Sequence, residues 1–170
     1  MGAGAGHSQL RPVHLLRHPL PRPHRREGAR MSRRVIGVGA EHRGDDAVGI
    51  EVARRLKNVD AVTCQGGSLD LIDLWEGWCD VVIVDAMRSG AEPGTVKRFD
   101  GLGDRLPSSS FVTTHALATG EAIELARVLH RLPPRLTVIG IEAGCVDLGA
   151  PMSPQVRGAA ERVAAEIDHA

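Results

Sequence analysis

The 170-residue chain contains no tyrosine, and aromatic residues make up only 2% of it. A hydrophobic core must therefore be built mainly from aliphatic side chains, which dominate the 42% of residues that are hydrophobic. Proteins that bind single-stranded nucleic acid stack the bases on exposed aromatic rings. The shortage of such rings argues against nucleic acid as a partner.

Long hydrophobic runs are also missing, since nowhere do about 18 apolar residues follow one another as a membrane-spanning helix requires. We therefore expect no membrane partner. Paired arginines at 33–34 are followed by only six apolar residues before Glu41, which is too short for an export signal. Three widely spaced cysteines, Cys64, Cys79 and Cys145, argue against a disulfide framework or a cysteine-based zinc site. The sequence predicts buried thiols in a cytoplasmic protein.

The net charge is zero, but the charges are unevenly distributed. Residues 1–30 hold six arginines and one glutamate, and the remaining 140 residues hold 15 basic and 20 acidic side chains. The first segment has too few apolar residues to fold, and Met31 stands directly before the first expected strand. We predict that residues 1–30 are a disordered basic leader or a mis-assigned start, and that residues 31–170 form one domain.

From residue 33 onward, apolar runs of strand length alternate with segments of helical period. Strands are expected at 33–38, 60–64, 81–84, 95–99, 111–115 and 136–141, and helices at 46–57, 69–76, 117–130 and from 153 onward. Ser68 and Ser153 stand where helix caps are favoured. The alternation predicts an α/β fold, a three-layer αβα sandwich with a mostly parallel twisted sheet.

The turn after the first strand holds Gly37, Gly39 and Gly44 and ends in Asp45 and Asp46. Glycine-rich turns in this place usually bind phosphate at a helix N-terminus. An aspartate pair repels phosphate, and the glycine spacing departs from GxGxxG. The turn therefore favours a cation or a carbonyl group, and a nucleotide-binding enzyme is the weakest of the alternatives.

Several polar side chains follow the ends of expected strands. Asp46 comes after the first strand, Asp85 ends the 81–84 strand, His115 ends the 111–115 segment, and Glu142 ends the 136–141 strand. The carboxyl ends of parallel strands meet at one edge of a sheet, where ligands bind. Two carboxylates and an imidazole suit nickel, zinc or manganese. We predict a joint site at this edge.

Each of these residues also has a purely structural explanation. Asp45 could cap a helix, and Asp46 could be a first-turn acid stabilised by the helix dipole. Asp85 could cap a strand end, His115 could be a buried histidine, and Glu142 could pair with a basic residue such as Arg135 or Lys97. Cys145 lacks an evident base, which argues against a cysteine protease. Trp75 and Trp78 are expected in the core.

The ordered set of motifs resembles one known family. The matching pieces are Gly37-Val38-Gly39 with Asp45-Asp46 and Gly49, the 80–86 segment with Gly90 and Pro93-Gly94-Thr95-Val96, Thr114-His115, Pro133-Pro134-Arg135 with Ile139-Gly140-Ile141-Glu142, and Ser153-Pro154. Over residues 33 to 165 the chain is similar to the hydrogenase maturation proteases.

The resemblance implies an endopeptidase that removes the C-terminal extension of a nickel-iron hydrogenase large-subunit precursor after nickel insertion. Nickel would be carried by the precursor as the recognition element, with a divalent ion such as zinc as a substitute and no nucleotide cofactor. The family's metal contacts match Asp46, Asp85 and His115, and Asp46 and Asp85 are the implied catalytic residues, one of them as general base. The precursor is the implied partner of a monomeric enzyme.

Two positions differ from the usual family pattern. Ala40 stands where asparagine is common, and Ala47 replaces a frequent glycine. The alternative interpretation is therefore a non-catalytic, metal-sensing hydrogenase assembly factor with the same fold.

Overall fold

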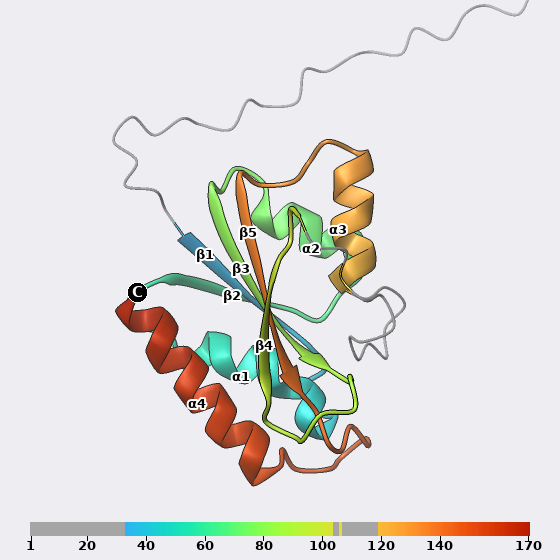
Figure 1. Ribbon diagram of the computed structural model, residues 1–170, viewed down its shortest axis with the longest axis vertical. Coiled ribbons are helices and arrows are strands. Elements are labelled where there is room, and N and C mark those ends of the chain that lie inside the picture. The colour runs from blue at the N-terminus through green and yellow to red at the C-terminus, as the bar shows by residue number, and fades with distance from the viewer. Residues whose placement is uncertain (1–32, 104–105, 107–118) are drawn as a thin grey trace, which may run out of the picture.

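A computed structural model describes residues 33–103, 106 and 119–170 (Figure 1). The strands are β1 (Arg33–Val38), β2 (Asp60–Cys64), β3 (Asp80–Met87), β4 (Val96–Asp100) and β5 (Arg135–Glu142). The helices are the 3-10 turn η1 (Gly44–Ala47), α1 (Val48–Arg55), α2 (Ser68–Trp75), α3 (Thr119–Val128) and α4 (Pro154–His169). In these ranges no helix is both long and apolar enough to cross a membrane. The expected leader and the 111–115 strand lie outside the described residues.

The five strands form one sheet in the order β2-β1-β3-β5-β4. Strands β2, β1, β3 and β5 are parallel, and β4 pairs antiparallel with β5 at the edge. In the register of the sheet, Gly37 of β1 pairs with Val84 of β3, and Met87 of β3 pairs with Glu142 of β5. The mostly parallel sheet is confirmed.

Helices cover both faces of the sheet (Figure 1). Helices α1 and α4 pack on one face, and α2 and α3 pack on the other, each pair closing a separate aliphatic cluster. Strand β3 is buried along its whole length and contributes Val82 and Val84 to the first cluster and Val81 and Ile83 to the second. This alternation confirms the three-layer αβα sandwich.

Several expected element ends are wrong by a few residues. Strand β3 continues beyond Asp85 to Met87, and the expected 46–57 helix is divided into η1 and α1. Ser68 is the first residue of α2 and not its cap, because Gly67 takes that place and donates its N–H to Oδ2 of Asp70 at 2.9 Å. Local sequence does not distinguish these adjacent starting points.

The cysteines only partly match the prediction. All three are free, but only Cys64 is buried, whereas Cys79 and Cys145 are exposed. Trp75 is fully enclosed in the core as expected, and Trp78 is half-buried with the Arg34 guanidinium 4.1 Å above its ring. Exposure of two thiols follows from their positions in loops, which the apolar character of cysteine does not reveal.

Gly49 allows α1 to approach the ends of β1 and β3 closely. A Cβ atom added there would lie 2.2 Å from the carbonyl oxygen of Val84 and 2.3 Å from that of Val38. Both neighbours are backbone atoms of the central sheet, which cannot yield as a flexible side chain can. The close approach brings the turn before α1, and Asp46 with it, against β3.

We expect Gly49→Ala to lower the free energy of unfolding by about 1–3 kcal/mol, the usual cost of overpacking a core. Gly158→Ala in α4 is the matched control, because its added methyl would meet only the Arg162 side-chain tip at 3.5 Å. That control should be neutral or stabilising by up to about 1 kcal/mol. Urea denaturation of both variants checks the prediction, and equal stabilities would contradict it.

Candidate functional site

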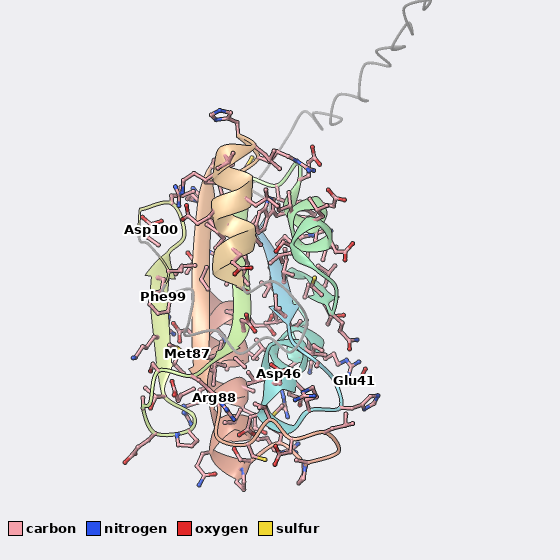
Figure 2. All side chains as sticks on the ribbon, turned by 90° about the vertical axis from the view of Figure 1, so that its right-hand side faces the viewer. Glu41, Asp46, Met87, Arg88, Phe99 and Asp100 are labelled. Atoms are coloured by element: carbon pink, nitrogen blue, oxygen red, sulfur yellow. The ribbon has the colours of Figure 1, made fainter. Side chains whose placement is uncertain are left out.

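The site lies where the strand order reverses. Strand β2 pairs on one side of β1 and β3 on the other, so the chain leaves β1 and β3 in opposite directions across the sheet. In open α/β sheets the crevice at such a switch point binds ligands. Figure 2 shows Asp46, just beyond β1, at the same end of the sheet as Met87 and Arg88, where β3 ends.

Asp85 projects from β3 and is completely buried. Its Oδ2 accepts a hydrogen bond from the Thr119 hydroxyl at 2.6 Å, and its Oδ1 accepts one from the Ala86 N–H at 2.8 Å. Burial raises the pKa of Asp85 to about 7, and the negative charge of Asp46 adds to the rise, while the Thr119 hydrogen bond opposes it. This carboxyl group can therefore gain or lose a proton near neutral pH.

Asp46 lies in η1 and is 1% exposed. Its effect on the pKa of Asp85 shows that the two carboxyl groups share one electrostatic environment, although 39 positions separate them in the sequence. Two acids of like charge in one apolar setting favour binding of a cation between or beside them. The structure thus places Asp46 and Asp85 near the same end of the sheet, and their joint role in a site stays a prediction.

His115 lies outside the described residues, so its predicted place in the site stays a prediction. Within 33–103, 106 and 119–170, no three histidine, cysteine or acidic residues are grouped so that they could hold a metal ion. The described part of the site offers two carboxylates, which as hard oxygen donors suit a divalent ion but do not complete its coordination by themselves.

Glu142 reaches the same edge of the sheet but has a structural role. Its carboxylate accepts hydrogen bonds from the Ser89 N–H and hydroxyl, both at 2.8 Å, and from the Gly90 N–H at 2.9 Å. Of the two basic residues considered as structural partners, Lys97 donates to the Ser89 hydroxyl and Arg135 lies 3.4 Å from the Asp80 carboxylate. Glu142 fixes the turn after β3.

Asp45 does not cap its own helix. The residue that caps η1 is Arg43, and no side chain makes the capping hydrogen bond. The Asp45 carboxylate instead accepts hydrogen bonds from the loop after β5 and from Ser153, the N-cap residue of α4. The adjacent acids Asp45 and Asp46 therefore have different environments.

Sequence reasoning missed two side-chain contacts, those of Thr119 and Ser153. Thr119 is expected only as part of a helix, and nothing in its neighbours indicates that its hydroxyl reaches Asp85. Ser153 is the N-cap residue of α4 as expected, but its hydroxyl donates to Asp45 at 3.1 Å and makes no capping hydrogen bond. Both contacts join residues more than 30 positions apart, which a local pattern cannot show.

Comparison with known proteins identifies the family. The family model described as hydrogenase maturation protease matches residues 47–170. The chain belongs to this family. The family is one of hydrolases, endopeptidases of hydrogenase maturation. The matched range begins directly after Asp46.

Solved structures and a curated relative agree with this assignment. The NiFe hydrogenase maturation protease HycI of Thermococcus kodakarensis is 27% identical, with a TM-score of 0.66 over 82% of this chain and 91% of that one. HybD of the same organism, at 24% identity, supports the fold alone, with a TM-score of 0.62 over 82% and 98% of the two chains. The hydrogenase expression/formation protein HupD of Thiocapsa roseopersicina is 26% identical over 80% of this chain and 64% of its own length.

The pKa of Asp85 predicts a specific dependence of stability on pH. Between its ordinary value of 3.8 and about 7, the folded protein keeps the Asp85 proton and the unfolded chain releases it. The contribution of Asp85 to stability therefore falls as the pH rises through this window and stays low above it. The Asp85→Asn variant has no proton to lose at this position. Its free energy of unfolding minus that of the wild type should therefore increase by up to about 4 kcal/mol between pH 4 and pH 7.

Urea denaturation at several pH values measures this difference. The control is Asp147→Asn, the same chemical change on an exposed side chain. A difference between Asp85→Asn and the wild type that stays constant from pH 4 to pH 7 would show that the buried carboxyl group is not the source.

Proposed function

We propose that the protein is an endopeptidase that removes the C-terminal extension of a nickel-iron hydrogenase large-subunit precursor once nickel has been inserted. The observation that carries this proposal is the pair of buried acids, Asp46 and Asp85, at the switch point of the sheet in a member of this family. We place the reaction in the cytoplasm and expect the enzyme to act as a monomer on the precursor.

Nickel belongs to the substrate in this proposal. An ion that the precursor already holds by its own ligands needs only a few further contacts from the protease. Asp46 and Asp85 would supply carboxylate oxygens, and His115 is the third contact implied by the family resemblance. Two acids can therefore distinguish the nickel-loaded precursor from the nickel-free one. They add metal contacts to the loaded precursor and few contacts to the nickel-free precursor.

The raised pKa of Asp85 explains how two neighbouring acids can be buried before the ion binds. Without a cation, the buried carboxyl group keeps its proton over much of the neutral range, which avoids two neighbouring buried charges. A divalent ion next to Asp46 and Asp85 favours the ionised form and releases the proton. Docking of the loaded precursor would therefore convert Asp85 from a neutral group to a charged one.

Hydrolysis then needs a polarised carbonyl group and a proton acceptor. A divalent ion at the scissile bond can polarise the carbonyl oxygen or lower the pKa of a water molecule. One of the two aspartates takes the proton from the attacking water and passes it to the leaving amine as the C–N bond breaks. Asp46 and Asp85 are the residues proposed for this role, one in metal contact and the other also as general base.

Ala40 is the observation that favours the second candidate, a non-catalytic metal-sensing assembly factor. Its methyl side chain is 8% exposed and stands beside the turn that carries Asp46. It offers no hydrogen bond where the family commonly has an amide. If that amide is needed to hold the peptide, the chain would bind the precursor without cutting it.

A cleavage assay distinguishes the two candidates. The purified protein is mixed with the nickel-loaded and the nickel-free precursor from the same organism, and the products are weighed by mass spectrometry. We expect a short C-terminal peptide to be lost from the loaded form only. Asp46→Asn and Asp85→Asn should each slow this loss by roughly 10²–10⁴-fold, the usual contribution of a general base. If the protein binds the nickel-loaded and the nickel-free precursor but cuts neither, the result would support the assembly factor.

The rate of processing should also depend on pH in a defined direction. Because the ionised form of Asp85 is needed, kcat/KM should rise as the pH increases through about 7 and then level off. Thr119→Val removes the hydrogen bond that lowers the pKa of Asp85, so the rise should move to higher pH. Thr119→Ser keeps the hydroxyl and is the control. Superimposable profiles for the valine and serine variants would contradict this account.

A further inference from the structure

The Asp45 carboxylate joins the turn η1 to the connection between β5 and α4, about 100 positions away in the sequence. It is fully buried, and its Oδ1 accepts a hydrogen bond from the Ser153 N–H at 2.6 Å. Its Oδ2 accepts hydrogen bonds from the Gly144 N–H at 2.9 Å, the Cys145 N–H at 3.0 Å and the Ser153 hydroxyl at 3.1 Å. These four partners are all donors, which is what an ionised carboxylate requires.

The backbone around Asp45 is built against the same loop. The Asp45 N–H donates to the carbonyl oxygen of Cys145 at 2.8 Å. Gly44 has a φ of +55°, and a Cβ atom at this position would lie 2.5 Å from that oxygen. The Gly149 N–H donates to the carbonyl oxygen of His42 at 2.7 Å. The turn before α1 and the connection between β5 and α4 therefore contact each other at several points.

Asp46 depends on this contact for its place. It follows Asp45 directly in η1, a four-residue turn whose own hydrogen bonds include that from the Asp46 N–H to the carbonyl oxygen of Arg43. A single 3-10 turn is weakly held by itself. Anchoring one residue of it to three residues of the β5–α4 connection fixes the rotation of the turn, and thus the direction of the neighbouring carboxylate.

We propose that Asp45 is a positioning residue, which clamps η1 to the β5–α4 connection and thereby holds Asp46 in the geometry needed to meet the substrate-borne ion. This inference rests on the proposed function for its catalytic consequence. It assigns different roles to the two adjacent aspartates, because Asp45 is saturated by donors and Asp46 shares the environment of Asp85. Asp45 itself does not touch the substrate.

Asp45→Asn tests the clamp. The variant has the same shape, but its NH2 group replaces one carboxylate oxygen and then faces backbone N–H donors. At least one hydrogen bond is therefore lost, and two donors are left against each other. We expect kcat for processing to fall about 10- to 100-fold, as misplacement of a catalytic group does, with KM for the precursor changed less than about threefold. Asp147→Asn, in the same loop and exposed, should match the wild type.

A second readout needs no substrate. Backbone order parameters from ¹⁵N relaxation should lie near 0.85 for residues 45–47 in the wild type and drop toward 0.6 in Asp45→Asn. A folded Asp45→Asn variant with wild-type kcat and unchanged order parameters would overturn the inference. If the wild type itself fails to cut any precursor, the proposed function has failed, and the order parameters still decide whether Asp45 holds the turn.

Ser153→Ala keeps the test valid if Asp45→Asn does not fold. It removes one of the four hydrogen bonds and leaves the Ser153 N–H in place, so kcat should fall about two- to tenfold. In the double variant with Asp45→Asn, the serine change should add little, because both act on one contact. Two outcomes would show that the clamp does not position Asp46. One is that the effects of the two substitutions on kcat add fully in the double variant. The other is that Ser153→Ala has wild-type kcat and wild-type order parameters in η1.

Discussion

Burial of carboxylates at the carboxyl ends of the parallel strands is the constraint on which this structure depends. A buried carboxylate is costly unless donors surround it. Asp45 has four donors and Glu142 has the amides and hydroxyl of the turn after β3, so both stabilise the fold. Among the described residues, Asp85 accepts hydrogen bonds from Thr119 and from its own neighbour Ala86, and the charge of Asp46 acts on it. Burial with few donors raises the pKa of Asp85, whereas the donors around Asp45 and Glu142 tie distant loops together.

The switch point explains why these groups gather there. Gly49 lets α1 approach β1 and β3 at backbone contact distance, which brings η1 to the end of β3. The connection from β5 to α4 then packs on η1 through Asp45. In this member of a family of maturation endopeptidases, the same edge of the sheet thus carries both Asp46 and Asp85, and both are buried.

Most of the fold could be predicted from the sequence. The aliphatic run 81–84 identified the central strand because a strand covered on both faces needs apolar residues on both, and the 60–64 strand has the expected ends. Asp46 and Asp85 were predicted to meet because each follows or ends a parallel strand. The errors lie at ends, as at Ser68 and Met87, where neighbouring residues are equally able to begin or continue an element. The predicted role of His115 and the predicted strand at 111–115 were not tested.

The sequence by itself determined the layered architecture, the edge of the sheet that carries the acids, and the family, because periodicity and ordered motifs are local properties that survive without coordinates. Only the tertiary structure decided what each acid does. Asp45 and Asp46 are adjacent and chemically identical, but Asp45 is surrounded by donors from residues about 100 positions away, whereas the charge of Asp46 raises the pKa of Asp85. Burial and hydrogen-bond partners set the charge and the role of a carboxyl group, and both come from parts of the chain that are remote in sequence.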